Sequence, residues 1–195
     1  MKRMNLHDLT FNAPKNGYAP AEDSWLLAEH LPNVTGKKCV DMGCGSGIQS
    51  AALAINGAAE IWSVDQNPHA LETTKKLFEK YFPSARIHLV ESHLFEALAR
   101  ETFDIIVFNP PYVPSEKIQW KEVDGGKKGR EIIDAFLNQM PHHLAKNGAC
   151  YLLQTSLNGK RTTEKILEEK NLKGTIIATQ KLAFEELWVW KITEK

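Results

Sequence analysis

The sequence contains few of the features that mark secreted, membrane or zinc proteins. It has only three cysteines, Cys39, Cys44 and Cys150, without paired Cys-x-x-Cys spacing, which argues against a disulfide framework and against a zinc site. We interpret them as small core residues. The longest apolar runs, such as Ile105 to Phe108, are far shorter than the roughly 20 residues of a membrane-spanning helix. The N-terminus also has no apolar signal-peptide stretch, so we expect a cytoplasmic protein without a membrane partner.

An excess of charge of one sign is absent as well. Lys and Arg together number 24, as do Asp and Glu, so the formal net charge is zero and no global field draws the protein to nucleic acid. The 43% hydrophobic content is ordinary for a soluble domain with a full core. Because we find no repeat or low-complexity tract, we expect one domain over residues 1–195, in which residues 1–31 form a lead-in and a helix beside the functional site.

Strand and helix patterns alternate along the chain. Five segments have the composition of buried strands: 38–42, 61–64, 87–90, 103–108 and 149–154. Stretches with helical character separate or follow them: 48–57, 68–83, 94–99, 130–145 and 158–171. This alternation predicts an α/β protein with a parallel sheet covered on both faces. Pro141 predicts a kink or break in the fourth helix.

Two later regions depart from this alternation. The runs 175–179 and 187–192 have no helix between them, which predicts an antiparallel pair. Residues 113–128 have no convincing periodicity, and a loop of that length in a compact domain is usually functional or disordered.

A glycine-rich loop follows the first predicted strand. Asp41, Gly43, Gly45 and Gly47 lie where the strand gives way to a helix, and glycines there let a ligand approach the main chain. The dinucleotide fingerprint Gly-x-Gly-x-x-Gly is not met, which argues against a dehydrogenase. Asp65 ends the second strand near the spacing at which an acid binds ribose hydroxyls, which suggests a nucleoside cofactor such as S-adenosylmethionine. The alternative is a simple turn with a helix-flanking acid.

The segment Asn109-Pro110-Pro111-Tyr112 follows the fourth strand, at the sheet edge where open α/β folds bind ligands. Each proline restricts the residue before it to extended backbone, so the segment is rigid. It presents the Asn109 side-chain oxygen and the Pro110 carbonyl as two acceptors, with the Tyr112 ring beside them. Two fixed acceptors suit a planar –NH₂ group, which they aim at an electrophilic methyl. The alternative is a structural turn closed by two prolines.

In order and position, these motifs resemble those of the class I S-adenosylmethionine-dependent amino-methyltransferases. Residues 18–27 (YAPAEDSWLL), 125–131 (GGKKGRE) and 186–189 (ELWV) are further similar to the HemK-like protein glutamine methyltransferases of the short archaeal and eukaryotic type. The resemblance covers nearly the whole chain. It implies a Rossmann-like seven-stranded sheet, mostly parallel with an antiparallel C-terminal strand, and methylation of the glutamine amide in the Gly-Gly-Gln motif of a class 1 release factor.

The same resemblance assigns roles to individual residues. It implies three catalytic residues: Asn109, Pro110 and Tyr112. It implies nine residues that contact the cofactor S-adenosylmethionine: Ser24, Asp41, Gly43, Gly45, Gly47, Asp65, His93, Leu94 and Asn109. It implies eight residues that bind or shape the entrance for the substrate: Tyr18, Pro20, Asn109, Pro110, Pro111, Tyr112, Gly126 and Arg130. It implies no metal ligand.

One position departs from the family pattern. Members usually have an Asp that contacts the adenine amino group where this chain has His93. Three alternatives are open. Glu91 could replace the missing Asp from a neighbouring position, His93 could bond the adenine differently, or His93 could only cap the following helix.

The family also implies a protein partner. Short members often require a small zinc-binding activator subunit, and the third strand, 87–90, is expected at the sheet edge, where unpaired backbone groups invite strand addition.

Three other functions remain open from the sequence. A nucleic-acid amino-methyltransferase would act on the exocyclic amine of adenine or guanine, but the charges of the loop 113–128 are too balanced for a phosphate-binding strip. A lysine methyltransferase would need a base to deprotonate the ammonium. An inactive cofactor-binding scaffold is supported only by His93.

Overall fold

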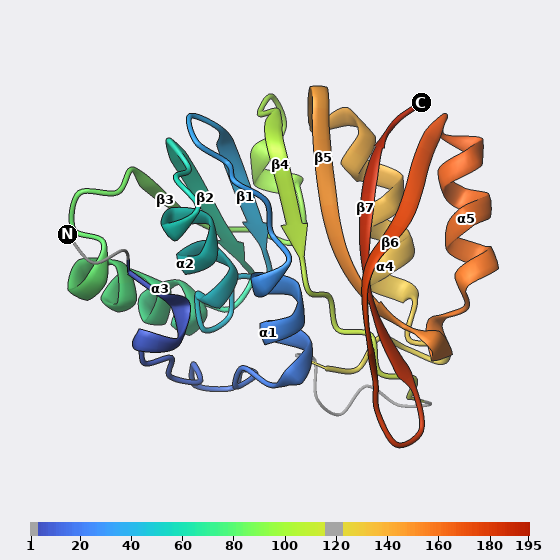
Figure 1. Ribbon diagram of the computed structural model, residues 1–195, viewed down its shortest axis with the longest axis horizontal. Coiled ribbons are helices and arrows are strands. Elements are labelled where there is room, and N and C mark those ends of the chain that lie inside the picture. The colour runs from blue at the N-terminus through green and yellow to red at the C-terminus, as the bar shows by residue number, and fades with distance from the viewer. Residues whose placement is uncertain (1–3, 116–122) are drawn as a thin grey trace.

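A single seven-stranded sheet forms the centre of the molecule, with strand order β3-β2-β1-β4-β5-β7-β6 (Figure 1). The computed structural model describes residues 4–115 and 123–195. The strands are β1 Lys38–Met42, β2 Glu60–Asp65, β3 Ile87–Glu91, β4 Phe103–Phe108, β5 Leu144–Thr155, β6 Leu172–Lys181 and β7 Glu186–Glu194. Only β7 runs antiparallel to its neighbours β5 and β6; the pairs on the other side of β5 are parallel. The predicted sheet is therefore confirmed.

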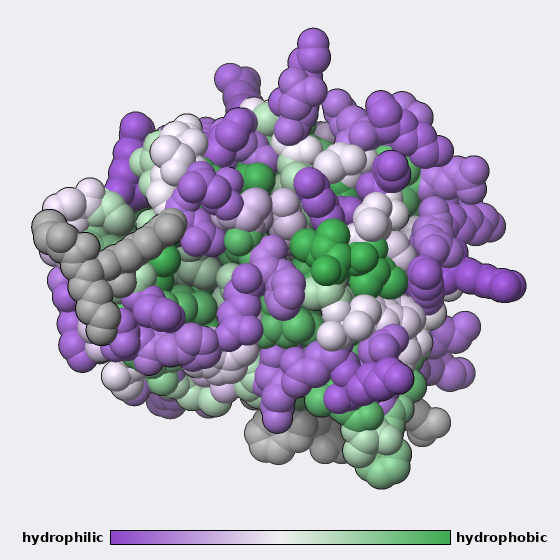
Figure 2. Space-filling view, viewed as in Figure 1, coloured by the Kyte–Doolittle hydropathy of each residue, from purple (hydrophilic) through white to green (hydrophobic). Residues whose placement is uncertain are grey.

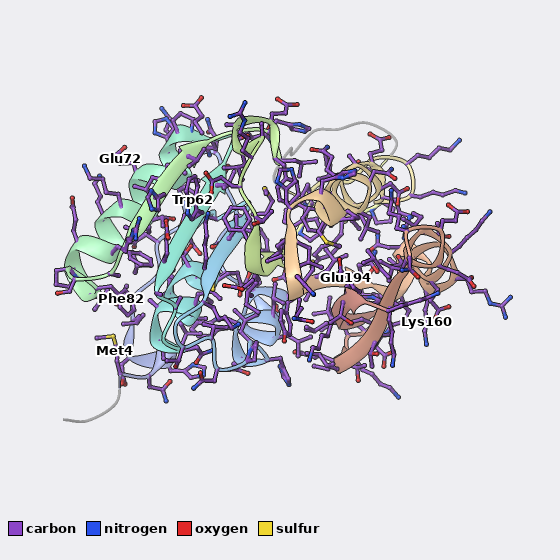
Figure 3. The ribbon with its side chains drawn as sticks, turned by 90° about the horizontal axis from the view of Figure 1, so that it is seen from above. Met4, Trp62, Glu72, Phe82, Lys160 and Glu194 are labelled. Atoms are coloured by element: carbon purple, nitrogen blue, oxygen red, sulfur yellow. The ribbon has the colours of Figure 1, made fainter. Side chains whose placement is uncertain are left out.

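Helices cover both faces of the sheet. They are α1 Glu22–Glu29, α2 Ile48–Ile55, α3 Pro68–Tyr81, α4 Glu131–Gln139 and α5 Lys160–Glu169, with short 3-10 helices η1 Leu6–Asp8, η2 Glu96–Leu98, η3 Met140–His142 and η4 Ser156–Asn158. One core cluster joins α1, α2 and α3 to the sheet, and a second joins α4 and α5 to it. Figure 3 shows α3, marked by Glu72, and α5, marked by Lys160, at opposite ends of the molecule.

The start of α3 follows from its sequence. The Asn67 side chain accepts a hydrogen bond from the backbone N–H of His69 at 3.0 Å, and Pro68 occupies the first helical position, where its missing N–H costs nothing. The three cysteines are buried and free, as expected. Within the described residues, no helix is long and apolar enough to cross a membrane.

Three helix predictions need correction. The helix expected over 94–99 is wrong: only the short η2 forms, because Leu94 has a φ of +48°, which no α-helix accommodates. The helix expected over 130–145 ends at Gln139, since Pro141 removes a backbone donor and Leu144 already pairs with Phe103 in the sheet. The break at Pro141 is thus confirmed. The last helix is shorter than the expected 158–171.

The C-terminal strands form the predicted antiparallel hairpin, and β7 inserts between β5 and β6. In the loop expected over 113–128, residues 116–122 lie outside the described residues. Its described ends pair with each other: the backbone N–H of Val113 donates to the Val123 carbonyl, and that of Gly125 donates to the Val113 carbonyl, both at 2.9 Å. The loop therefore returns to the segment that follows β4.

Candidate active site

A cavity of about 680 Å³ lies at the carboxyl edge of the parallel strands. Its walls come from the segment before α1, the loop between β1 and α2, the end of β2, the segment after β3 and the segment after β4. These segments meet there because parallel strands bring their carboxyl ends to one edge of a sheet. In Figure 1 this is the lower edge, toward which β4 points. Its size is typical of a small-molecule site.

The glycine loop and Asp65 form one wall. Gly43 and Gly45 line the cavity, and the N–H of Gly45 donates to Asp65 Oδ2 at 3.0 Å. Asp65 Oδ1 accepts from the N–H of Asn67 at 2.8 Å, and burial raises the pKa of this carboxyl. The Gln66 backbone N–H also contributes a hydrogen bond to this carboxylate, which keeps the remaining acceptor capacity for a hydroxyl donor. Gly47 does not line the cavity; its φ is +82°, and an added Cβ would lie 3.0 Å from Thr74 Oγ1 of α3.

Asp41 lies below this loop and does not line the cavity. Its Oδ2 accepts from the N–H and hydroxyl of Ser50 at 2.9 and 2.6 Å, and Ser50 Oγ lies 2.7 Å from Ser63 Oγ. This series of hydrogen bonds connects β1, α2 and β2. Asp41 Oδ1 is buried without a hydrogen-bond partner among the described residues, and burial raises the pKa of the carboxyl to about 7. Direct contact between Asp41 and the cofactor stays a prediction.

Asn109 lies at the centre of the cavity wall and is oriented by α1. Its Nδ2 donates to Asp23 Oδ2 at 3.0 Å. Its Oδ1 is buried and has no hydrogen-bond partner in the part of the chain that the structure describes. A buried amide oxygen without a donor is costly, and a ligand N–H satisfies it. The amide is therefore held by Asp23 in a cavity-lining residue, and its buried oxygen is an acceptor that no described residue satisfies.

Asp23 is the residue that sequence reasoning missed. Only 4% of it is exposed, and its carboxylate accepts from the Tyr112 hydroxyl at 3.0 Å and the Tyr18 hydroxyl at 3.1 Å. It also accepts from the N–H of Ser24 at 2.7 Å. One carboxylate thus holds Asn109, Tyr112 and Tyr18 together. Its acidic type in the YAPAEDSW motif was the available signal, but only the fold shows that it meets the segment after β4.

Tyr112 and Tyr18 line the cavity as neutral donors. Burial, followed by the Asp23 charge and the hydrogen bond to it, raises the pKa of both phenols well above the usual value. Neither is a base near neutral pH. Pro20, Ser24, Pro110 and Pro111 also line the cavity, and their contacts with cofactor or substrate stay predictions.

The described end of the loop after Val113, at Gly125 and Gly129, lies directly against the Pro111–Tyr112 backbone. An added Cβ at Gly125 would lie 2.7 Å from the Pro111 carbonyl, and one at Gly129 would collide with the Tyr112 carbonyl. Gly125 lines the cavity, whereas the predicted substrate residue Gly126 does not. The tight packing leaves no room for side chains at Gly125 and Gly129.

Arg130 is buried behind this loop and does not line the cavity. It donates to Thr163 Oγ1 at 2.9 Å and to the Asn158 carbonyl at 2.7 Å, and it pairs with Asp134. The Asn158 side chain in turn donates to the Tyr112 carbonyl at 2.8 Å. Arg130 thus supports the site from behind, and substrate contact by it stays a prediction.

His93 and Leu94 line the cavity at the end of the β3 side, and Glu91 does not. His93 is exposed, and its Nδ1 lies 3.2 Å from Glu96 Oε1. His93 therefore occupies the position at which the family pattern expects an adenine contact, with a carboxylate as its neighbour.

A doubly wound sheet with a glycine loop after β1, an acid after β2 and an Asn-Pro-Pro-Tyr segment after β4 defines a class I methyltransferase. The sequence model described as the methyltransferase small domain matches residues 21–182. The chain belongs to this family and is an S-adenosylmethionine-dependent N-methyltransferase.

Individual methyltransferases resemble this chain over most of its length. A Methanocaldococcus jannaschii protein, provisionally named a protein N5-glutamine methyltransferase, is 41% identical over 90% of this chain and 92% of its own length. Human methyltransferase HEMK2 is 33% identical over 91% of this chain and 89% of its own length. A chain in the structure of the E. cuniculi Mtq2–Trm112 complex, responsible for methylation of the translation termination factor eRF1, superimposes with a TM-score of 0.74 at 28% identity. It covers 92% of this chain and 99% of that one.

The cavity residues fit S-adenosylmethionine. Asp65 keeps acceptor capacity for ribose hydroxyls, and the backbone at Gly43 and Gly45 is open to close approach. His93 and Leu94 also line the cavity, and their contact with the adenine stays a prediction. When bound, the cofactor supplies an electrophilic methyl group on a sulfonium.

Proposed function

We propose that this protein methylates the side-chain amide nitrogen of a glutamine in another protein, in the Gly-Gly-Gln motif of a class 1 release factor. The observation that carries the proposal is the Asn109 amide. Its Nδ2 is bound to Asp23, and its buried Oδ1 has no partner among the described residues of a cavity wall. The name of the M. jannaschii relative supports a glutamine side chain as the methyl acceptor, and that of the E. cuniculi complex supports a translation termination factor as the substrate.

Asn109 and Pro110 act on the amide by binding it. The Asn109 Oδ1 and the Pro110 carbonyl accept its two N–H bonds, which increases electron density on nitrogen and fixes its direction. Holding two reacting atoms in line is worth about 7 to 11 kcal/mol in favourable cases. Tyr112, held by Asp23, packs beside the bound amide and excludes water.

The alkylated nitrogen needs no strong base, because it becomes very acidic as the new N–C bond forms. The surroundings agree with this chemistry. Both oxygens of Asp23 already accept hydrogen bonds, and the Tyr112 phenol stays protonated. An amide acceptor is favoured over a lysine ammonium for the same reason, since the ammonium must first lose a proton and has no lone pair until it does.

We also propose a small partner subunit that adds a strand at the edge of the sheet. β3 is an edge strand, and Ile87, His88, Leu89 and Val90 are each half-buried. Trp62 of β2, labelled in Figure 3, stacks on His88 with ring centroids 4.4 Å apart. Unpaired backbone groups beside apolar side chains suit strand addition, and the similarity to a chain of the Mtq2–Trm112 complex supports it.

A test of the partner uses co-expression with a candidate zinc-binding subunit. We expect co-purification and higher methyl transfer with the wild type, and neither with Leu89→Glu. Lys80→Glu, on the exposed side of α3, is the control. Full activity of the chain alone would contradict the need for a partner.

The function is tested by labelled methyl transfer to a purified release factor, to its Gly-Gly-Gln variant with Gln replaced by Ala, and to generic RNA. We expect label only in the intact factor, and none with Asn109→Ala, which keeps cofactor binding. Label in the Gln-to-Ala variant would move the acceptor to another side chain, and label in RNA would favour a nucleic-acid amine.

A further inference from the structure

The hairpin of β6 and β7 ends in an exposed apolar tip. The turn is closed by a hydrogen bond from the N–H of Leu182 to the Glu185 carbonyl at 2.8 Å. Phe184 is 95% exposed, the highest value among the exposed large hydrophobic residues of the described chain, and Leu182 is 37% exposed. Figure 1 shows the hairpin projecting beyond the carboxyl ends of the parallel strands, and Figure 2 shows a hydrophobic tip at that place.

The base of the hairpin is linked to the candidate active site through η4. The Glu185 charge is near enough to contribute to the raised pKa of Tyr112, the residue that lines the cavity after β4. The N–H of Glu186 donates to Ser156 Oγ at 3.1 Å, which brings η4 against the base of the hairpin. Leu157, the next residue, is 54% exposed.

A second contact connects η4 to the site. Asn158 donates to the Tyr112 carbonyl at 2.8 Å, so Leu157 lies between two residues that are bonded to the hairpin and to the cavity rim. Single exposed apolar side chains are ordinary, but apolar groups gathered at the rim of a site mark a binding surface. Leu157 on η4 and Leu182 and Phe184 in the hairpin turn are exposed apolar side chains, and we name these three residues the rim patch.

The hairpin is held firmly enough to serve as a contact. Its two strands pair from Leu172 opposite Glu194 to Lys181 opposite Glu186, directly up to the turn. β7 also pairs with β5 in the middle of the sheet. A preformed contact loses little conformational freedom when a partner covers it.

We propose that the rim patch docks the folded protein that carries the target glutamine. Its side chains insert into an apolar recess of that protein, outside the loop that enters the cavity. This rests on the proposed function. The occupant follows from position: a folded protein that places a side chain on Asn109 must pass the Tyr112 rim, and the rim patch borders that path. A short peptide fills the cavity without covering the patch.

The test compares two substrates with the double variant Phe184→Ser and Leu157→Ser, in the presence of the partner subunit if one is required. With the intact release factor, we expect KM to rise by roughly 10- to 100-fold, the range for loss of one or two buried apolar side chains. With a short Gly-Gly-Gln peptide, we expect kcat/KM to change by less than about twofold, because the cavity is unaltered.

Two controls separate docking from folding. Ile177→Ser removes another exposed apolar side chain, 40% exposed, from β6 itself, and we expect it to leave both substrates unaffected. Phe184→Leu keeps the tip apolar and should retain most of the activity on the intact factor.

Several outcomes overturn the proposal. Docking is excluded if the double variant methylates the intact factor as well as the wild type does, or if both substrates lose activity equally. It is also excluded if the wild type forms a dimer in sedimentation that Phe184→Ser abolishes, since the patch then binds a second copy. If the wild type methylates neither substrate, the proposed function itself fails, which the wild-type assays reveal before any variant is compared.

Discussion

The Asp23 carboxylate gives the sharpest test of how the site is built. In Asp23→Asn one oxygen becomes an –NH₂ group of nearly the same shape. If that group faces Asn109, two donors meet where Nδ2 now donates to Asp23 Oδ2 at 3.0 Å. The Asn109 amide then turns over, and its –NH₂ takes the place of the unpartnered Oδ1. The acceptor for the target amide is lost, while the cavity keeps its volume.

The size of the effect follows from this loss. Removing one preorganised hydrogen-bonding group lowers kcat by about 10²- to 10³-fold, equal to about 2.7–4 kcal/mol. The alternative orientation of the new amide leaves the buried N–H of Ser24 without an acceptor, at a cost of about 1–3 kcal/mol in stability. Because that cost disfavours the alternative orientation, we expect the new –NH₂ group to face Asn109, with a large drop in kcat and nearly unchanged cofactor affinity.

The assay is single-turnover methyl transfer at saturating cofactor, with calorimetry for cofactor affinity and urea denaturation for stability. Glu22→Gln is the matched control, because it makes the same change of charge one residue away at an exposed position of α1. A kcat for Asp23→Asn within about threefold of the wild type, in a folded protein, would refute the positioning role of Asp23.

Three further predictions concern the cavity and its support. Asp65→Ala should weaken cofactor binding in calorimetry by at least about tenfold, with kcat at saturating cofactor much less affected; unchanged affinity would remove Asp65 from the ribose site. Gly129→Ala should cost about 1–3 kcal/mol in urea denaturation and reduce activity, because φ is +65° and the new methyl group meets the Tyr112 carbonyl; a variant as stable as wild type would contradict that packing. For Asp41, burial raises the pKa from 3.8 to about 7. Between pH 4 and pH 7 the folded state therefore keeps a proton that the unfolded state has lost, and the free energy of unfolding falls as the pH rises. The free energy of unfolding of Asp41→Asn minus that of wild type should therefore rise between pH 4 and 7, by at most about 4 kcal/mol, and a flat difference would contradict a neutral Asp41.

Much of the fold follows from local sequence signals. The start of α3 could be predicted from Asn67 and Pro68, because a capping side chain and a fixed φ act within a few residues. The break at Pro141 was predictable for the same reason. The helix expected at 94–99 failed because Leu94 adopts a left-handed backbone between β3 and β4, a conformation that no local pattern announces.

The candidate site divides in the same way. Asp65 and the Asn109–Tyr112 segment were predictable, since each lies at the end of a strand whose composition is clear. Asp23 was not, because its partner Asn109 is 86 residues away in the sequence and the contact exists only after α1 packs on the sheet. The buried contacts of Arg130 with Asn158 and Thr163 were not predictable either, and substrate contact by Arg130 stays a prediction.

The sequence by itself determined the order of strands and helices, the rigid Asn-Pro-Pro-Tyr segment and the family, since propensities, proline restrictions and motifs are local properties. Only the tertiary structure decided that the side-chain oxygen of Asn109 has no partner among the described residues, that Asp41 is buried outside the cavity lining, and that the β6–β7 hairpin meets η4. These depend on which distant segments meet at one edge of the sheet, and burial, hydrogen-bond partners and raised pKa values arise only from that meeting.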